Sequence, residues 1–139
     1  MNIKATYINL PVRDLTKTRQ FWNALGFTFY EQFCDNKALC LELKKDTIYA
    51  MLITHEFFKT FTNRPIAENT TTQVLLAIEV KNKEQVNQIV QAAFANGGQR
   101  YREAADHEWM YYDSFVDIDG HQWEVMCTDT AKLQESQGL

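Results

Sequence analysis

Cysteine, proline and glycine are scarce in the 139-residue sequence, which holds three, two and five of them. Cys34, Cys40 and Cys127 form no CxxC pair, so neither a zinc cluster nor a redox dithiol is supported. We interpret them as reduced thiols packed as small apolar groups. Only Pro11 and Pro65 occur, and no low-complexity segment divides the chain. The length therefore favours a single domain.

An excess of basic residues is also missing. The sequence has 14 Lys and Arg against 18 Asp and Glu, a formal net charge of −4. Nucleic acids and anionic membranes attract clustered basic residues, so neither partner is expected. No apolar run approaches the roughly 18 residues of a spanning helix, and the N-terminal segment does not resemble a signal peptide. We therefore expect a cytoplasmic protein.

The sequence does contain one pattern twice. Residues 6–12 alternate between apolar and polar, which predicts a strand, and a helix follows from the N-cap Asp14 to the stop at Gly26. Residues 74–80 alternate in the same way, and a second helix follows from the N-cap Asn82 to a glycine pair. The matching positions are 68 residues apart, about half the chain, which indicates a duplicated unit.

Short strand-like runs follow each predicted helix. They are 27–34, 38–43 and 47–54 in the first half, and 99–103, 111–116 and 121–127 in the second. Each half therefore predicts the order βαβββ. We place the repeat units at about residues 4–61 and 72–128 of one domain, 1–128, and interpret residues 129–139 as a polar C-terminal tail.

Three short motifs resemble a known family. The first strand leads into the helix as Val12-Arg13-Asp14-Leu15, the helix ends in Leu25-Gly26-Phe27, and residues 117–124 are DIDGHQWE. In this order, over residues 4–128, they resemble the vicinal oxygen chelate superfamily of glyoxalase I, bleomycin-resistance proteins and extradiol dioxygenases. The branch of predicted lactoylglutathione lyases is the most similar. The resemblance implies an α+β fold, in which two βαβββ units form an eight-stranded open cup with helices outside.

The resemblance also implies where a metal would bind. In the family's metalloenzymes, the first and last strand of each unit supply one ligand each, and these positions correspond to Tyr7, Met51, Leu75 and Glu124. Only Glu124 is a strong ligand, because a tyrosine with a pKa of ~10 rarely ionises near neutral pH. Zinc, nickel and iron usually need three or more protein ligands. We therefore predict no metal site and no cofactor.

The residues expected to line the cup give a mainly apolar surface with a few polar groups, as small-molecule sites have. They are Tyr7, Asn9, Met51, Leu75, Ala77, Gln122, Glu124 and Met126. Trp109 is expected near the rim of the cup. Either Tyr111 or Tyr112 is expected to close the cup, because neighbouring residues of a strand face opposite sides. Glu124 is the candidate catalytic base. It could instead anchor a cationic ligand, or bond to Tyr7 and Gln122.

The three histidines are weaker candidates. His121 is an odd number of residues from Glu124 and therefore faces the opposite side of its strand. His55 is expected to face solvent. His107 precedes an aromatic segment that would reach the rim of the cup and is the best functional candidate of the three, although we favour a position in a surface loop.

Two functions stay open. One is a metal-independent protein that binds a small organic molecule. The alternative is a lyase or isomerase related to lactoylglutathione lyase, with Glu124 as the base. A second copy of the chain is the other expected partner, because open sheet edges and the aromatic insert with Phe57, Phe58 and Phe61 need cover. We therefore predict a homodimer.

Overall fold

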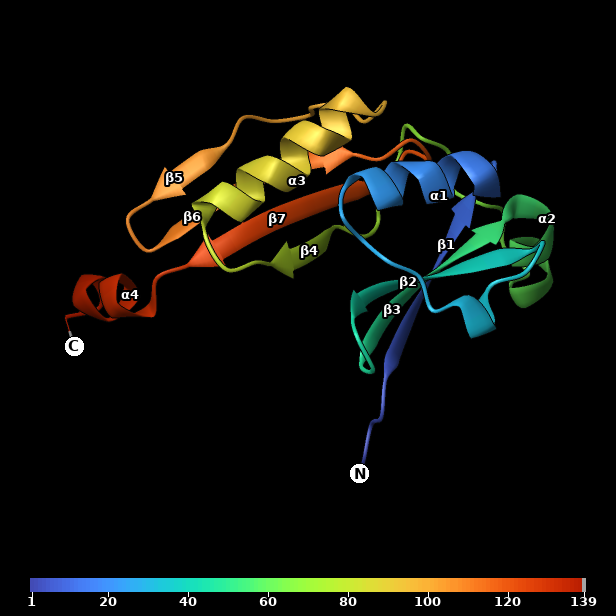
Figure 1. Ribbon diagram of the computed structural model, residues 1–139, viewed down its shortest axis with the longest axis horizontal. Helices are drawn as coiled ribbons and strands as arrows, with labels where there is room; N and C mark the ends of the chain where they lie inside the picture. The colour runs from blue at the N-terminus through green and yellow to red at the C-terminus, as the bar shows by residue number, and fades with distance from the viewer. Residues whose placement is uncertain (139) are drawn as a thin grey trace. The chain divides into compact units, whose positions relative to one another are not determined.

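The computed structural model describes residues 1–138. These residues form two compact units, an N-terminal unit that ends at Thr71 and a C-terminal unit that begins at Thr72. Each unit combines one β-sheet with helices, as Figure 1 shows along the colours of the chain. No helix in the described part of the chain is long and apolar enough to cross a membrane.

The N-terminal unit holds a three-stranded sheet. Its elements are β1 (Thr6–Val12), α1 (Leu15–Ala24), the 3-10 turn η1 (Glu31–Phe33), β2 (Ala38–Lys44), β3 (Ile48–Thr54), α2 (His55–Phe58) and the 3-10 turn η2 (Lys59–Phe61). The strand order is β1-β3-β2, with β1 parallel and β2 antiparallel to β3. Parallel strands need a crossover connection, and α1 lies within it.

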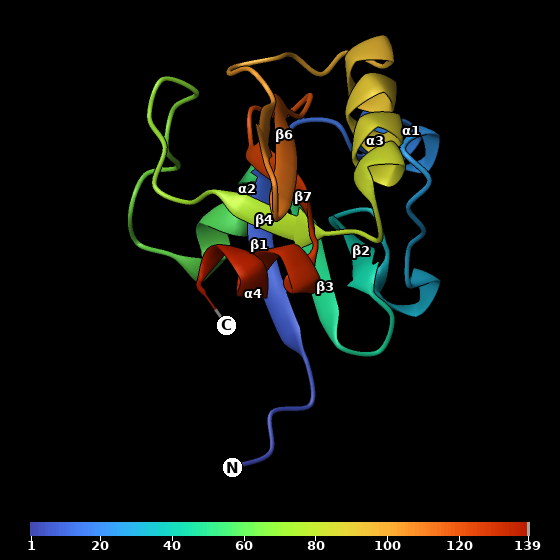
Figure 2. The same cartoon turned by 90° about the vertical axis from the view of Figure 1, so that its left-hand side faces the viewer.

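The C-terminal unit holds a four-stranded sheet. Its elements are β4 (Leu76–Glu79), α3 (Lys83–Ala95), β5 (Ala105–His107), β6 (Met110–Val116), β7 (Gln122–Thr128) and α4 (Thr130–Ser136). The strand order is β4-β7-β6-β5, and only the pair β4–β7 is parallel. Figures 1 and 2 show α3 along one face of this sheet, where it packs on β6 and β7.

Both predicted helix starts are confirmed. The Asp14 carboxylate accepts a bond at 3.0 Å from the backbone N–H three residues on. The Asn82 side chain accepts one from the backbone N–H of Gln85 at 2.9 Å, and the Gln85 side chain accepts one in return from Lys81. Each cap satisfies N–H groups that have no partner inside the helix. Gly26 ends α1 at a φ of 92°, which glycine adopts without strain.

The α+β class is confirmed and the C-terminal unit follows the predicted order βαβββ, but the N-terminal unit lacks the strand predicted at residues 27–34 and has the order βαββ. Only Phe29 pairs there, in an isolated bridge with Leu41. The backbone N–H of Phe33 instead donates to the Tyr30 carbonyl at 3.1 Å, within the 3-10 turn. Turn bonds of this kind take the donors that a sheet would need.

The strand predicted at 99–103 is displaced. Gln99 forms an isolated bridge with Val116, but regular pairing resumes only where Ala105 meets Tyr112. The register has shifted by two residues between these points, so the segment between them is irregular. Gly98 allows the chain to pass close to both Ala93 of α3 and Val116 of β6, since a Cβ there would lie 2.8 Å from the Ala93 carbonyl oxygen and 3.0 Å from that of Val116.

The predicted polar tail contains a helix. Residues 130–136 form α4, and Asp129 caps it by accepting a bond at 3.1 Å from the backbone N–H of Lys132. The side chains of this segment are exposed apart from Leu133. Leu139 lies outside the described residues.

Candidate functional site

One face of the N-terminal sheet carries three of the predicted site residues. In the register of β1 and β3, Asn9 lies beside Met51 and Tyr7 lies beside Tyr49. The Tyr7 and Tyr49 rings stack with their centroids 5.1 Å apart. Tyr7 stays 47% exposed, so this face presents an aromatic ring to its surroundings.

The thiol of Cys40 lies on the same face but is unreactive. Cys40 pairs with Met51 across β2 and β3 and is completely buried. Burial raises the pKa of its thiol to about 11, because the anionic thiolate is poorly solvated there. The thiolate is the nucleophilic form, so Cys40 is not a nucleophile near neutral pH.

The C-terminal sheet carries a second group of predicted residues on one face. Glu124 on β7 lies between Ala77 on β4 and Ser114 on β6. Gln122 and Met126 share this face by strand parity, and all three β7 side chains are partly exposed. Leu75 precedes β4 and is 51% exposed.

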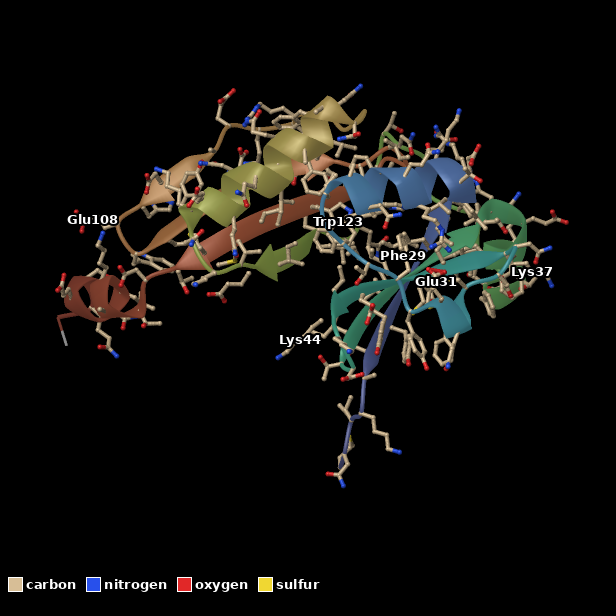
Figure 3. The ribbon with its side chains drawn as sticks, viewed as in Figure 1. Phe29, Glu31, Lys37, Lys44, Glu108 and Trp123 are labelled. Carbon is tan, nitrogen blue, oxygen red and sulfur yellow. The ribbon has the colours of Figure 1, made fainter. Side chains whose placement is uncertain are left out.

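The opposite face of this sheet packs against α3. Trp123 and Val125 are fully buried there, as parity predicted (Trp123 is labelled in Figure 3). The Tyr111 hydroxyl also points to this side, since it donates to the Asn87 side chain of α3 at 2.7 Å. Tyr112 pairs with Met126 and therefore shares the face of Glu124. Of Tyr111 and Tyr112, it is therefore Tyr112 that lies on the same face as Glu124.

Trp109 lies elsewhere in the C-terminal unit. With His107 and Tyr111 it lines a surface hollow of about 450 Å³. Lys83 closes one side, with its ammonium 2.8 Å from the Asp106 carboxylate and 4.5 Å from the centre of the Tyr111 ring. Glu108, labelled in Figure 3, marks the β5–β6 turn at this end of the unit. The structure therefore separates Trp109 and Tyr111 from Glu124.

Two hydroxyls beside Glu124 were missed from the sequence. The Tyr101 and Ser114 hydroxyls are buried, and neither has a hydrogen-bond partner within residues 1–138. Burial raises the pKa of the Tyr101 phenol; the nearby Ser114 hydroxyl opposes this rise, and the Glu124 charge adds to it. The two hydroxyls are therefore neighbours that do not reach hydrogen-bond geometry. Pairing the two predicted strands at 111–116 and 121–127 as a hairpin would have placed Ser114 opposite Glu124. Tyr101 could not be placed in this way, because it lies in the irregular segment between Gln99 and Ala105.

The DIDG motif has a structural role. The Asp117 carboxylate is buried and accepts three bonds, from the Trp123 indole N–H at 2.8 Å and from the backbone N–H groups of Asp119 and His121 at 2.9 and 3.0 Å. Burial raises its pKa, and the neighbouring His121 opposes that rise. The motif thus fixes the β6–β7 turn and, with it, the register that places Glu124.

The donor set around Glu124 does not suit the family's metal. Its cross-strand neighbours Ala77 and Ser114 offer no carboxylate, imidazole or thiolate. Among residues 1–138, no group of three or more His, Cys, Asp or Glu side chains is placed to hold a metal ion. Of the four positions that the resemblance assigns, Tyr7, Met51 and Leu75 carry side chains that bind zinc, nickel or iron poorly.

Solved structures share this fold. A hypothetical protein from S. aureus is 25% identical, with a TM-score of 0.77 over 91% of this chain and 95% of its own. A glyoxalase/bleomycin resistance protein/dioxygenase family enzyme from Burkholderia phytofirmans is 18% identical, with a TM-score of 0.71 over 88% and 97%. A fosfomycin resistance protein from Mesorhizobium loti is 15% identical, with a TM-score of 0.67 over 96% and 99%.

No curated protein matches the chain. The family model of the Glyoxalase/Bleomycin resistance protein/Dioxygenase superfamily matches residues 4–125, which include the first repeat unit, most of the second, and Glu124. The two strand–helix units, the motifs at the strand ends and this match agree, and the chain belongs to that superfamily.

Proposed function

We propose that the protein binds a small organic molecule on the sheet face that carries Glu124, without the family's full set of metal ligands. The observation that supports this most directly is the composition of the face. A carboxylate lies among the apolar Ala77 and Met126 and the ring of Tyr112; Ala77 is exposed and the other three side chains are partly exposed. An apolar surface with a few polar groups suits an organic ligand.

Turnover is the second candidate function, because Glu124 could remove a proton from a bound substrate. Two hydroxyls lie next to its carboxylate, and both could donate to an oxygen on which negative charge develops. A lyase or isomerase related to lactoylglutathione lyase would use Glu124 in this way.

A thermal-shift screen of small organic molecules tests binding. A ligand at 100 times its dissociation constant should stabilise the protein by about 2.7 kcal/mol. The variant Glu124→Gln keeps the shape of the side chain but cannot act as a base. We expect it to lose this stabilisation if the carboxylate anchors the ligand, and to keep binding but lose turnover if Glu124 is a base. Unchanged behaviour in both assays would contradict a functional role for Glu124.

Metal binding separates this protein from the family's metalloenzymes. After incubation with zinc, nickel or ferrous ions and dialysis, we expect far less than one equivalent of metal per chain by elemental analysis, because one strong ligand does not hold such ions against water. We also expect no lactoylglutathione lyase activity with added metal. One equivalent of metal that is lost in Glu124→Gln would refute the proposed metal-free site.

We further propose that the protein is a cytoplasmic homodimer. Phe61 is 60% exposed and contacts Phe57, so the aromatic insert presents apolar rings at the surface. Sedimentation at tens of micromolar, where ordinary interface affinities suffice, should show a dimer. The variant Phe61→Ser should shift the protein toward monomer, and an unshifted dimer would show that this insert is not the interface.

A further inference from the structure

Four residues of the C-terminal unit form a row across its sheet. Glu124 pairs with Ala77 on one side and with Ser114 on the other. Gln99 bridges Val116, and continuing that antiparallel pairing by two residues brings Tyr101 opposite Ser114. The Ser114 hydroxyl lowers the pKa of the Tyr101 phenol and the Glu124 charge raises it, as expected of neighbouring side chains.

Two of the three polar groups of this row are buried without a hydrogen bond, and the third, the Glu124 carboxylate, is partly exposed. The Tyr101 and Ser114 hydroxyls are buried without a hydrogen bond. Within residues 1–138, Glu124 takes part in none of the ion pairs, which join Arg19 to Glu31, Lys83 to Asp106 and Arg100 to Asp113. Buried polar groups in native proteins nearly always find a partner, so two buried hydroxyls without one, next to a partly exposed carboxylate, indicate that a further molecule completes the site.

The charge of the row decides which group fits. The Glu124 carboxylate repels an anion and attracts a cation, while the Arg102 guanidinium, whose charge also acts on the Tyr101 phenol, donates to the hydroxyl of Tyr112 at 3.1 Å. A carboxylate and two hydroxyl oxygens are three acceptors, and a primary ammonium has three N–H donors to match them. The apolar Ala77 and Met126 beside Glu124 suit the carbon skeleton of such a molecule.

We propose that Tyr101, Ser114 and Glu124 form a binding subsite for the primary ammonium group of an organic amine. The inference rests on the proposed function, because it assigns a chemical class to the ligand of the same sheet face. The amine approaches from the side of Glu124, Tyr112 and Met126, since α3 covers the other face. Tyr101 and Ser114 bind it through their oxygens, and their own hydrogens turn toward Glu124.

Four probes of similar size test the proposal by NMR titration of the full chain. Benzylamine carries charge and N–H donors, benzyltrimethylammonium carries charge alone, benzyl alcohol is neutral, and benzoate is an anion. We expect benzylamine to bind with a millimolar dissociation constant, as its size allows, and about tenfold more tightly than the other three. Equal binding of the two cations would show that charge alone selects them, and would overturn the hydroxyl subsite.

Three variants locate the binding. Glu124→Gln removes the charge, and Tyr101→Phe and Ser114→Ala each remove one hydroxyl. Each should weaken benzylamine by about tenfold, the effect of one hydrogen bond to a charged group. Neither hydroxyl variant should lower the melting temperature of the free protein, because each hydroxyl lacks a partner there.

Tyr111→Phe is the matched control, because it removes a hydroxyl that is bonded, to Asn87, on the α3 face. It should lower the melting temperature and leave benzylamine binding unchanged. The subsite is refuted if benzylamine fails to bind, or if it binds equally well to Tyr101→Phe and Ser114→Ala. A compound from the thermal-shift screen that binds without an amine would then leave the proposed function standing and the subsite refuted.

Discussion

Replacing Asp117 by alanine should lower the free energy of unfolding by about 3 kcal/mol and the melting temperature by roughly 10 °C. The Asp117 carboxylate accepts bonds from the Trp123 indole and from two backbone N–H groups of the turn. Alanine leaves these donors without partners, and Trp123 is completely buried, so water cannot replace the lost bond. Urea unfolding followed by tryptophan fluorescence measures the change.

Trp123→Phe separates the bond to the indole from the bonds to the turn. This variant keeps an aromatic ring in the core but removes the indole donor together with part of the ring volume, and a double-mutant cycle cancels the cost of the lost volume. In a double-mutant cycle, Asp117→Ala should destabilise the Trp123→Phe protein by about 1 kcal/mol less than the wild type, since one of the three bonds is already absent. Equal destabilisation in both backgrounds would show that the indole bond does not contribute.

The Asp117 result bears on function through the position of Glu124. The turn fixes the register of β6 and β7, and this register places Glu124 opposite Ser114. A slip of one residue would move Glu124 to the face that α3 covers. Loss of ligand binding in Asp117→Ala, at a temperature where the variant is still folded, would therefore follow from a shifted strand.

Hydrophobic periodicity predicted the strands and helices wherever one face is buried. It placed β1, α1, β6, α3 and β7 because each buries a regular set of side chains. It failed at residues 27–34, where four apolar or aromatic residues suggested a strand. There the Tyr30 and Phe33 rings pack on each other, with centroids 4.8 Å apart, within a turn that strand parity does not describe.

The candidate site was predicted only in part, because the alternation of side chains between two faces describes regular strands and not turns or irregular segments. Parity alone placed Gln122, Glu124 and Met126 on one face, because a strand alternates by construction. Tyr101 could not be found this way, since it lies in the irregular segment between Gln99 and Ala105, which was predicted as part of a regular strand. Aromatic composition suggested Trp109, but nothing in a single sequence says which of two faces a residue before a strand will reach.

Arg100→Ala should be the second strongly destabilising variant, again by about 3 kcal/mol, because it leaves the negative charge of Asp113 buried without a cation. The Arg100 guanidinium binds both carboxylate oxygens of Asp113, at 3.0 and 3.3 Å, and the Asp113 side chain is only 4% exposed. The guanidinium also lies 4.8 Å from the centre of the Phe94 ring. Chemical denaturation measures the loss, and Arg100→Lys, which keeps the charge but not the paired bonds, should lose less.

The second substitution Asp113→Asn gives the decisive comparison. It removes the buried negative charge at position 113, so the double variant Arg100→Ala, Asp113→Asn should be more stable than Arg100→Ala alone. Arg100 and Asp113 each directly precede a hydroxyl residue of the row, Tyr101 and Ser114, and their bond ties the irregular edge segment to β6. The double variant should therefore regain stability without regaining benzylamine binding, because Tyr101 is no longer held opposite Ser114. Stability and binding that return together would show that Tyr101 is placed by some other contact.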